Sequence, residues 1–187
     1  MRPSQRITMS NSISTLRGTI LIRQSNLADA PNFRELRLGA LQDSPTAFSM
    51  DYDKALNQSI KHWEDMLIMN DQESTIFFAE HDGQLIGMTG IARGRSQKTR
   101  HSADVWGVYV IPEWRGLHIA GEMIKSCLAW AKARNIVVAR LGVTTINSAA
   151  VRCYERCGFT TYATESRALL HEGRYYDFHL MSLSLDK

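Results

Sequence analysis

The chain has 187 residues, 44% of them hydrophobic and 22% charged, which suits one globular domain large enough to fold without disulfides or metals. Its net charge of +3 comes from Arg2, Arg6 and Arg17, because the other 19 basic residues are balanced by 19 acidic residues. A neutral domain argues against nucleic-acid binding, which depends on neutralising phosphates, and no apolar run approaches the roughly 20 residues of a membrane span.

The N-terminal segment differs in composition from the rest of the chain. Residues 1–18 are polar and basic, and they lack the apolar middle of a secretory signal. We therefore expect a flexible N-terminal extension at 1–18, a single domain at 19–187 and a cytoplasmic location. The three cysteines, Cys127, Cys153 and Cys157, are odd in number, and we expect reduced thiols rather than a disulfide or a metal site.

The first third of the chain predicts a strand followed by two helical regions. Residues 19–24 form the β-branched run TILIRQ, which is typical of a strand. The dipeptide Ser25-Asn26 has the polar side chains that cap helices, and apolar residues at helical spacing follow it. The dipeptide Ser44-Pro45 ends this helix, and a second helical region is expected over residues 52–69.

The middle of the chain predicts antiparallel strands. Residues 75–81 (TIFFAEH) and 84–93 (QLIGMTGIAR) flank the dipeptide Asp82-Gly83, which suits the positive φ angles of a type I′ hairpin turn. After a polar loop at 94–101, residues 104–111 (DVWGVYVI) predict another strand, which Pro112 ends.

The last part of the chain predicts two helices and three strands. An amphipathic helix is expected at 116–134 and a strand at 137–145. A helix is expected at 148–157, capped by Asn147 and ended by Gly158. Two further strands are expected at 159–167 and 175–185, so the predicted order is β-α-α-β-β-β-α-β-α-β-β.

Residues 112–121 (PEWRGLHIAG) form a short motif with chemical meaning. A strand ends here, a turn with Arg115 and Gly116 follows, and a helix then begins. The N-terminus of a helix presents unpaired backbone N–H groups and a positive dipole, which together suit a phosphate or pyrophosphate. An Arg-Gly turn before a helix is nevertheless more often ordinary loop chemistry when it stands alone.

Residues 108–120 (VYVIPEWRGLHIA) and 147–159 (NSAAVRCYERCGF) together resemble the GCN5-related N-acetyltransferase (GNAT) superfamily. The resemblance implies an α+β fold, an α/β/α sandwich whose mixed central sheet has about seven strands, a splayed central strand pair and about four helices. It also implies an enzyme that transfers the acetyl group of acetyl-CoA, its co-substrate, to a primary amine by direct attack in a ternary complex, without a metal.

The resemblance assigns coenzyme binding to the turn and the following helix start. The phosphate-binding loop of the family corresponds here to Arg115, Gly116, Leu117, His118, Ile119 and Ala120, continuing to Gly121, with backbone amides around the pyrophosphate. His118 stands where the family usually has glycine, so a positive φ is less easily adopted. Histidine tolerates positive φ better than most residues, and its imidazole is an alternative donor to a phosphate oxygen.

The resemblance also assigns the catalytic groups. Backbone groups of Val108, Tyr109 and Val110 would bind the pantetheine arm, and the Val108 amide would stabilise the tetrahedral intermediate. Asn147 would contact the coenzyme arm, and the Tyr154 hydroxyl would protonate the departing thiolate as general acid. The two residues are about two helical turns apart, so their side chains are expected on the same side of the helix. The alternative role of Tyr154 is that of a core aromatic residue.

Several questions stay open at this point. His101, Asp104 and Glu80 are candidates for the general base, although each is more often a surface or capping residue. Phe48, Tyr52, Trp63 and the turn at 173–177 are candidates for the acceptor pocket, although an aromatic residue like Trp63 is more often core. The identity of the amine, a small molecule or a peptide, is not determined.

Two other functions and one assembly are compatible with the sequence. A non-catalytic acyl-CoA-binding sensor with the same fold is favoured by His118 and disfavoured by Asn147 and Tyr154. An enzyme with a cysteine nucleophile is disfavoured because no histidine base accompanies Cys153 or Cys157. Relatives commonly dimerise through their C-terminal strands, so a homodimer is also expected as a partner arrangement.

Overall fold

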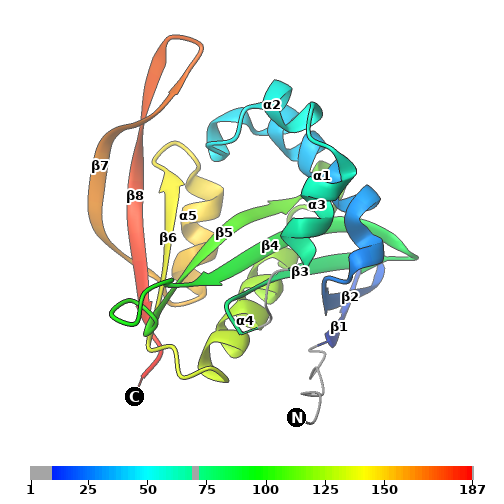
Figure 1. The fold of residues 1–187 in the computed structure, drawn as a ribbon, viewed down its shortest axis with the longest axis horizontal. Helices are drawn as coiled ribbons and strands as arrows, with labels where there is room; N and C mark the ends of the chain where they lie inside the picture. The colour runs from blue at the N-terminus through cyan, green and yellow to red at the C-terminus, as the bar shows by residue number, and fades with distance from the viewer. Residues whose placement is uncertain (1–9, 69–71, 187) are drawn as a thin grey trace.

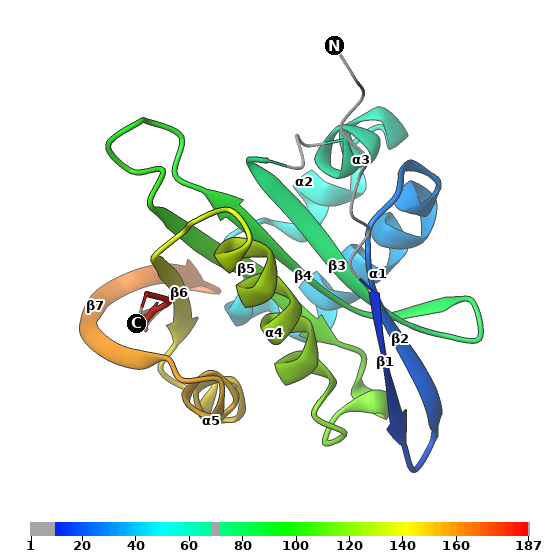
Figure 2. The same cartoon turned by 90° about the horizontal axis from the view of Figure 1, so that it is seen from below.

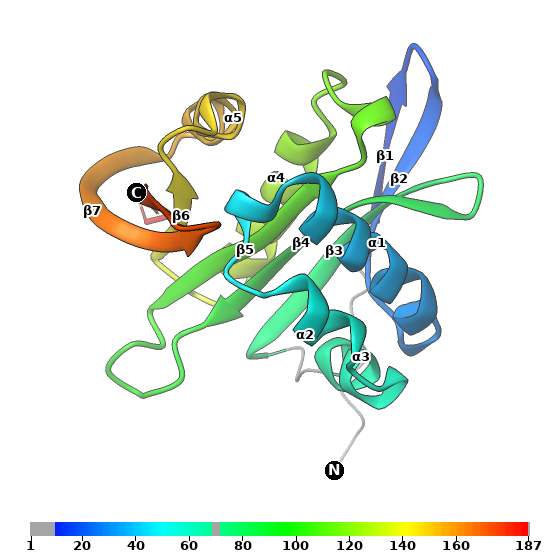
Figure 3. The ribbon, with the colours of Figure 1, turned by 90° about the horizontal axis from the view of Figure 1, so that it is seen from above.

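A twisted, mixed sheet of eight strands forms the centre of the computed structural model, which describes residues 10–68 and 72–186. The strand order is β1-β2-β3-β4-β5-β6-β8-β7. Helix α4 covers one face of the sheet, as Figure 2 shows, and α1, α2 and α3 cover the other, as Figure 3 shows. This confirms the α+β sandwich, with one strand more than expected.

The additional strand corrects the expected extent of the N-terminal extension. Strand β1 (Ser10–Thr15) pairs antiparallel with β2 (Gly18–Gln24) along its full length. Five of the six side chains of β1 are polar, and Ile13 is its single apolar residue, so the segment lacks the alternating apolar pattern by which a strand is recognised. Backbone hydrogen bonds to β2 therefore define it. Residues 1–9 of the expected extension lie outside the described part of the chain.

The helices on the first face follow the predicted positions with one interruption. Helix α1 (Ala30–Asp43) follows a short 3-10 turn that Asn26 and Asp29 close with a capping box. The helical region expected over residues 52–69 consists of two helices, α2 (Tyr52–Leu56) and α3 (Ile60–Leu67), because the Ser59 side chain accepts a hydrogen bond from the His62 amide and starts a new helix. Its expected end at Met69 lies outside the described residues.

The remaining elements agree with the predicted order. Strands β3 (Ser74–His81) and β4 (Gln84–Arg93) are joined at Asp82 and Gly83, whose φ angles of 47° and 79° are those of a type I′ turn. The elements that follow are β5 (Ser102–Val110), α4 (Ile119–Lys132), β6 (Val138–Thr144), α5 (Ser148–Arg156), β7 (Thr160–His171) and β8 (Arg174–Ser184).

The central strands β5 and β6 separate along their length. They form the parallel pair of the sheet and are in register only from Ser102 to Asp104. Beyond Arg140, β6 pairs with β8 as far as Thr144, while β5 pairs with β4. The separation confirms the expected splayed strand pair and opens the sheet at its centre.

Two hydrophobic clusters, one on each face, hold the helices to the sheet. Met123, Cys127 and Trp130 of α4 are fully buried in the first cluster, and Phe33 and Trp63 anchor the second. All three cysteines are free thiols. No helix in the described ranges is both long and apolar enough to cross a membrane.

Gly90 of β4 is required by its packing against Trp106 of β5. A Cβ atom at this position would overlap the indole ring, whereas a Cβ atom at Gly39 in α1 would meet nothing within 4 Å. We expect Gly90→Ala to destabilise the protein by about 1–3 kcal/mol through overpacking. The matched control Gly39→Ala is expected to stabilise it by about 0.5–1 kcal/mol. Urea unfolding measures both; equal effects would contradict this packing.

Candidate active site

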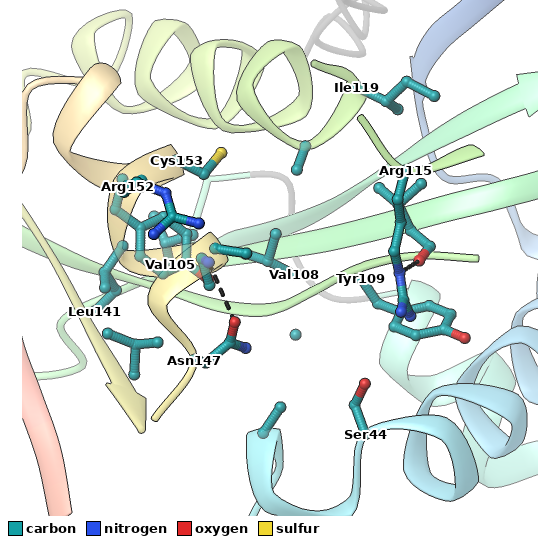
Figure 4. A pocket seen from close by; sticks show the side chains of 18 of the residues that line it. Ser44, Val105, Val108, Tyr109, Arg115, Ile119, Leu141, Asn147, Arg152 and Cys153 are labelled. Carbon is teal, nitrogen blue, oxygen red and sulfur yellow. Dashed lines mark hydrogen bonds between the residues drawn. The ribbon is translucent and has the colours of Figure 1, made fainter. Parts of the chain in front are cut away.

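A cavity of about 520 Å³ lies where β5 and β6 separate. Four segments of the chain meet there: the end of α1 with the segment after it, the second half of β5, the turn before α4, and the end of β6 with α5. Figure 4 shows ten of its side chains by name. The cavity is lined by Ser44, Ala47, Phe48, Val105, Trp106, Gly107, Val108, Tyr109, Val110, Trp114, Arg115, Gly116, His118, Ile119, Ala120, Leu141, Gly142, Val143, Thr144, Asn147, Ala149, Ala150, Arg152, Cys153, Tyr154 and Arg156.

A bulge in β5 faces this cavity. Tyr109 pairs with Met88 and Trp106 pairs with Gly90, so the two residues Gly107 and Val108 lie opposite one residue of β4. Gly107 has a φ of 66°, which glycine adopts without strain. Residues at a bulge are left out of the ladder of backbone hydrogen bonds. The Val108 backbone is therefore held at the opening and lies outside the regular pairing.

The turn before α4 has the backbone conformation of an anion-binding loop. Gly116 has a φ of 80°, and His118, the N-cap residue of α4, lies in the left-handed region with φ 61° and ψ 11°. The histidine thus adopts the positive φ for which the family uses glycine. Its side chain makes no capping hydrogen bond, so the first amides of a 14-residue helix are left for a ligand. His118 is exposed and lines the cavity, whereas Leu117 and Gly121 do not.

The Arg115 side chain ties this turn to two other elements. Its Nε atom donates to the Val110 carbonyl oxygen at 2.9 Å, its Nη2 atom forms an ion pair with Asp43, and its guanidinium lies 5.5 Å from the centre of the Tyr109 ring. Partial burial alone would raise the pKa of the Asp43 carboxyl, but hydrogen bonds from Arg115 and Ser44 hold that pKa below its usual value. Arg115 therefore positions the turn with its side chain.

Asn147 and Tyr154 reach the cavity from α5. Asn147 caps the helix by accepting a hydrogen bond from the Ala150 amide at 3.1 Å. This bond uses the side-chain oxygen, which leaves the NH₂ group available. Tyr154 is 7% exposed and packs against Phe159 with ring centres 6.3 Å apart. Within the described ranges its hydroxyl has no hydrogen-bond partner, and burial raises its pKa above the ordinary value.

Cys153 is the cavity-lining neighbour of Tyr154. A hydrogen bond from Cys157 lowers the pKa of Cys153 to about 7, with the nearby Arg156 contributing and burial opposing. The same bond and partial burial raise the pKa of Cys157. The opposite directions of the two shifts make Cys153 the more acidic thiol of the pair.

The structure shows which candidates for the general base and the acceptor pocket lie at the cavity. Glu80 is paired with Arg23, and none of Glu80, His101 and Asp104 lines the cavity. Trp63 is fully buried in an edge-on contact with Phe33 and is a core residue.

Phe48 lines the cavity at the α1 end, whereas Tyr52 and residues 173–177 do not. No sequence pattern indicated a role for Asp43, whose partner Arg115 is 72 positions away. Among the described residues that line the cavity, none is acidic, and no cluster of three or more metal-ligating side chains occurs within the described ranges.

The sequence matches the acetyltransferase (GNAT) family over residues 36–159. This range contains β5 with its bulge, the turn before α4, and α5. The chain therefore belongs to the GNAT family of acetyltransferases.

Individual relatives are distant. An uncharacterized N-acetyltransferase from Methanocaldococcus jannaschii is 26% identical over 143 residues, which are 75% of this chain and 61% of that protein. A GNAT-family acetyltransferase structure from Streptococcus pneumoniae superposes with a TM-score of 0.78 at 22% identity, over 88% of this chain and 98% of that one. The structure of yncA from Salmonella typhimurium with its cofactor acetyl-CoA superposes with a TM-score of 0.74 at 22% identity, over 95% of this chain and 96% of that one. At this identity the two structures support the fold.

His118 in the left-handed region makes a testable contribution to stability. This conformation disfavours residues with a Cβ by roughly 1–2 kcal/mol, and the greater freedom of glycine in the unfolded chain offsets about 0.4–1 kcal/mol of the gain. We expect His118→Gly to leave stability unchanged or raise it by up to about 1 kcal/mol, and β-branched His118→Val to lower it by more than about 1 kcal/mol. Urea unfolding compares them; His118→Val as stable as His118→Gly would contradict the assigned conformation.

Proposed function

We propose that the protein is an N-acetyltransferase that transfers the acetyl group of acetyl-CoA to a primary amine by direct attack in a ternary complex. The observation that carries this proposal is that one cavity brings together three features: the bulged end of β5 at Val108, the turn before α4 and the Tyr154 hydroxyl. They come from separate segments, and each matches one requirement of acetyl transfer.

The described residues fit the coenzyme at the α4 end of the cavity. The turn and the N-terminus of α4, which line the cavity at Gly116, His118, Ile119 and Ala120, present backbone amides that suit the pyrophosphate. The backbone of Val108, Tyr109 and Val110 lies where β6 has left β5, and apart from the Val110 carbonyl, which accepts from Arg115, it suits the amide groups of a pantetheine arm. The Asn147 side-chain NH₂ group lies at the same opening as a further donor. The similar yncA structure contains acetyl-CoA, which supports the choice of co-substrate.

The chemistry assigned to this chain uses two groups. Acetyl-CoA supplies the acetyl group as a thioester. The Val108 amide donates a hydrogen bond to the carbonyl oxygen as negative charge develops on it. When the amine forms the new C–N bond and the C–S bond breaks, the Tyr154 hydroxyl gives its proton to the thiolate, and the proton released by the amine restores the phenol. A phenol is already protonated at neutral pH, and burial raises the pKa of Tyr154 further.

The remaining expectations belong to the same proposal. The acceptor enters at the α1 end of the cavity, where Ser44, Ala47 and Phe48 line it. Strand β7 forms an edge of the sheet and exposes Tyr162 and Leu170, which supports a homodimer through the C-terminal strands. We also propose a cytoplasmic location.

Tyr154→Phe separates an enzyme from a coenzyme sensor. Loss of a general acid lowers turnover by about 10²–10⁴-fold, and the ring is retained, so we expect kcat to fall by at least about 10²-fold with the dissociation constant of acetyl-CoA changed by less than about threefold. Thiol release with a panel of amines measures kcat, and calorimetry with acetyl-CoA measures the dissociation constant. Tyr162→Phe, on exposed β7 outside the cavity, is the matched control. Full activity of Tyr154→Phe would refute the assigned acid; binding without turnover of any amine would favour the sensor.

Cys153→Ala tests direct transfer against a cysteine nucleophile. The pKa of about 7 and the place of Cys153 in the cavity are the observations that favour a covalent route. Under direct transfer we expect kcat to stay within about threefold of wild type, because no bond to sulfur is made. Mass spectrometry of the intact protein after acetyl-CoA without amine should detect no acetyl adduct at this residue. A kinetically competent acetyl-cysteine together with an inactive Cys153→Ala would replace direct transfer.

A further inference from the structure

Two of the three cysteines form a thiol pair at the cavity. Cys153 and Cys157 are four residues apart on α5 and at its C-cap, so they are neighbours on the helix surface, and a hydrogen bond joins their thiols. Both are partly exposed. Cys153 lines the cavity, and Figure 4 shows its sulfur atom pointing from α5 toward α4. The Cys157 Sγ atom lies 3.9 Å from the Gly121 carbonyl oxygen in the first turn of α4. The pair therefore extends from the cavity to the N-terminus of α4.

Two cations lie beside the pair. Arg156 forms a hydrogen bond with Cys153, and the charge of Lys125 acts on Cys157. Positive charge and a helix N-terminus near a thiol stabilise the thiolate, which is the nucleophilic form. Cys127, by contrast, is fully buried in the core, and burial raises its pKa to about 12. Among the three thiols, Cys153 therefore has the surroundings of a reactive cysteine.

The Cys153 thiol lies close to the place that the proposed function gives to the coenzyme sulfur. In that function the Tyr154 hydroxyl gives its proton to the sulfur, and Tyr154 and Cys153 line the same cavity. Burial and then the charge of Cys153 raise the pKa of Tyr154, so the thiol and the hydroxyl are near enough to interact. The pantetheine arm ends in rotatable single bonds, so its sulfur can turn from one group to the other.

From these observations we infer that Cys153 is a modification site that forms a mixed disulfide with coenzyme A. The inference rests on the proposed coenzyme site. Cys153 loses its proton to water, and its thiolate attacks the coenzyme sulfur of a disulfide between coenzyme A and a small thiol. A new S–S bond joins Cys153 to the coenzyme, and the old S–S bond breaks. Its electron pair leaves with the small thiolate, which takes a proton from water. Cys153 is thereby oxidised and the leaving sulfur reduced.

This mixed disulfide inactivates the protein reversibly. The tethered coenzyme occupies the turn before α4 and carries no acetyl group, so acetyl-CoA has no place to bind. A reducing thiol exchanges with the mixed disulfide, releases coenzyme A and restores Cys153.

Two matched disulfides test the inference on the unaltered protein. Coenzyme A 2-pyridyl disulfide and pantetheine 2-pyridyl disulfide share the reacting bond, and only the first carries the nucleotide and its phosphates. Release of pyridine-2-thione measures the rates. Because binding holds the sulfur beside Cys153, we expect the coenzyme A disulfide to react at least about 10-fold faster, and acetyl-CoA to slow it. Peptide mass spectrometry should find one coenzyme A on Cys153 and an unmodified Cys127. Equal rates, or an adduct at another residue, would overturn the inference.

Cys153→Ala tests the residue itself, with Cys157→Ala as the matched variant on the same helix. Each is treated with coenzyme A 2-pyridyl disulfide and compared with its own untreated activity on an amine that the wild type acetylates. The wild type and Cys157→Ala should take up one coenzyme A, lose activity and recover it with dithiothreitol, whereas Cys153→Ala should keep its activity and take up none. Modification of Cys153→Ala, or an adduct on Cys153 that leaves the wild type active, would contradict the site.

The disulfide reaction needs no amine, so the two proposals fail separately. If no amine is acetylated but Cys153 still reacts faster with the coenzyme A disulfide than with the pantetheine disulfide, the modification site stands and the proposed function fails. Calorimetry then measures whether the adduct blocks binding of acetyl-CoA, as the inference requires. If amines are acetylated but the two disulfides react equally fast, the proposed function stands and this inference falls.

Discussion

Strands β5 and β6 stay in register for only three residue pairs, from Ser102 to Asp104, and the cavity depends on their separation beyond that point. Strand β6 is held by β8 along its whole length, and β5 is held by β4, so neither can close the gap. Backbone groups at the centre of a sheet are normally paired, because leaving them buried and unpaired is costly. The open strand end at Val108 is therefore suited to a ligand that carries its own amide groups.

The elements around this opening are fixed by contacts between distant segments. Arg115 links the turn before α4 to the end of β5 and to Asp43 at the end of α1. The contact joins the coenzyme side of the proposed site to the acceptor side, so the two would keep a constant separation. His118 completes the turn in a conformation that disfavours side chains, which is the kind of local strain often found where a loop must present its backbone to a ligand.

The cavity is lined by positive charge. The N-terminus of α4 favours the phosphates of the proposed coenzyme, and the described residues that line the cavity include Arg115, Arg152 and Arg156 but no aspartate or glutamate. Among them lies the buried Tyr154, whose pKa burial raises above the ordinary value of a phenol.

The sequence by itself determined what depends on neighbouring residues: the hairpin at Asp82-Gly83, the caps at Asn26 and Asn147, and the motifs that indicate the family. It did not determine β1, whose single apolar residue Ile13 gives no periodic pattern, or the break at Ser59 within an apolar helical repeat. Only the tertiary structure decided that Arg115 meets Asp43, 72 positions away, and that the buried Arg37 guanidinium stacks on the Phe48 ring. Capping and periodicity act over a few residues, whereas the partner of a buried charge depends on which distant segments the sheet brings together.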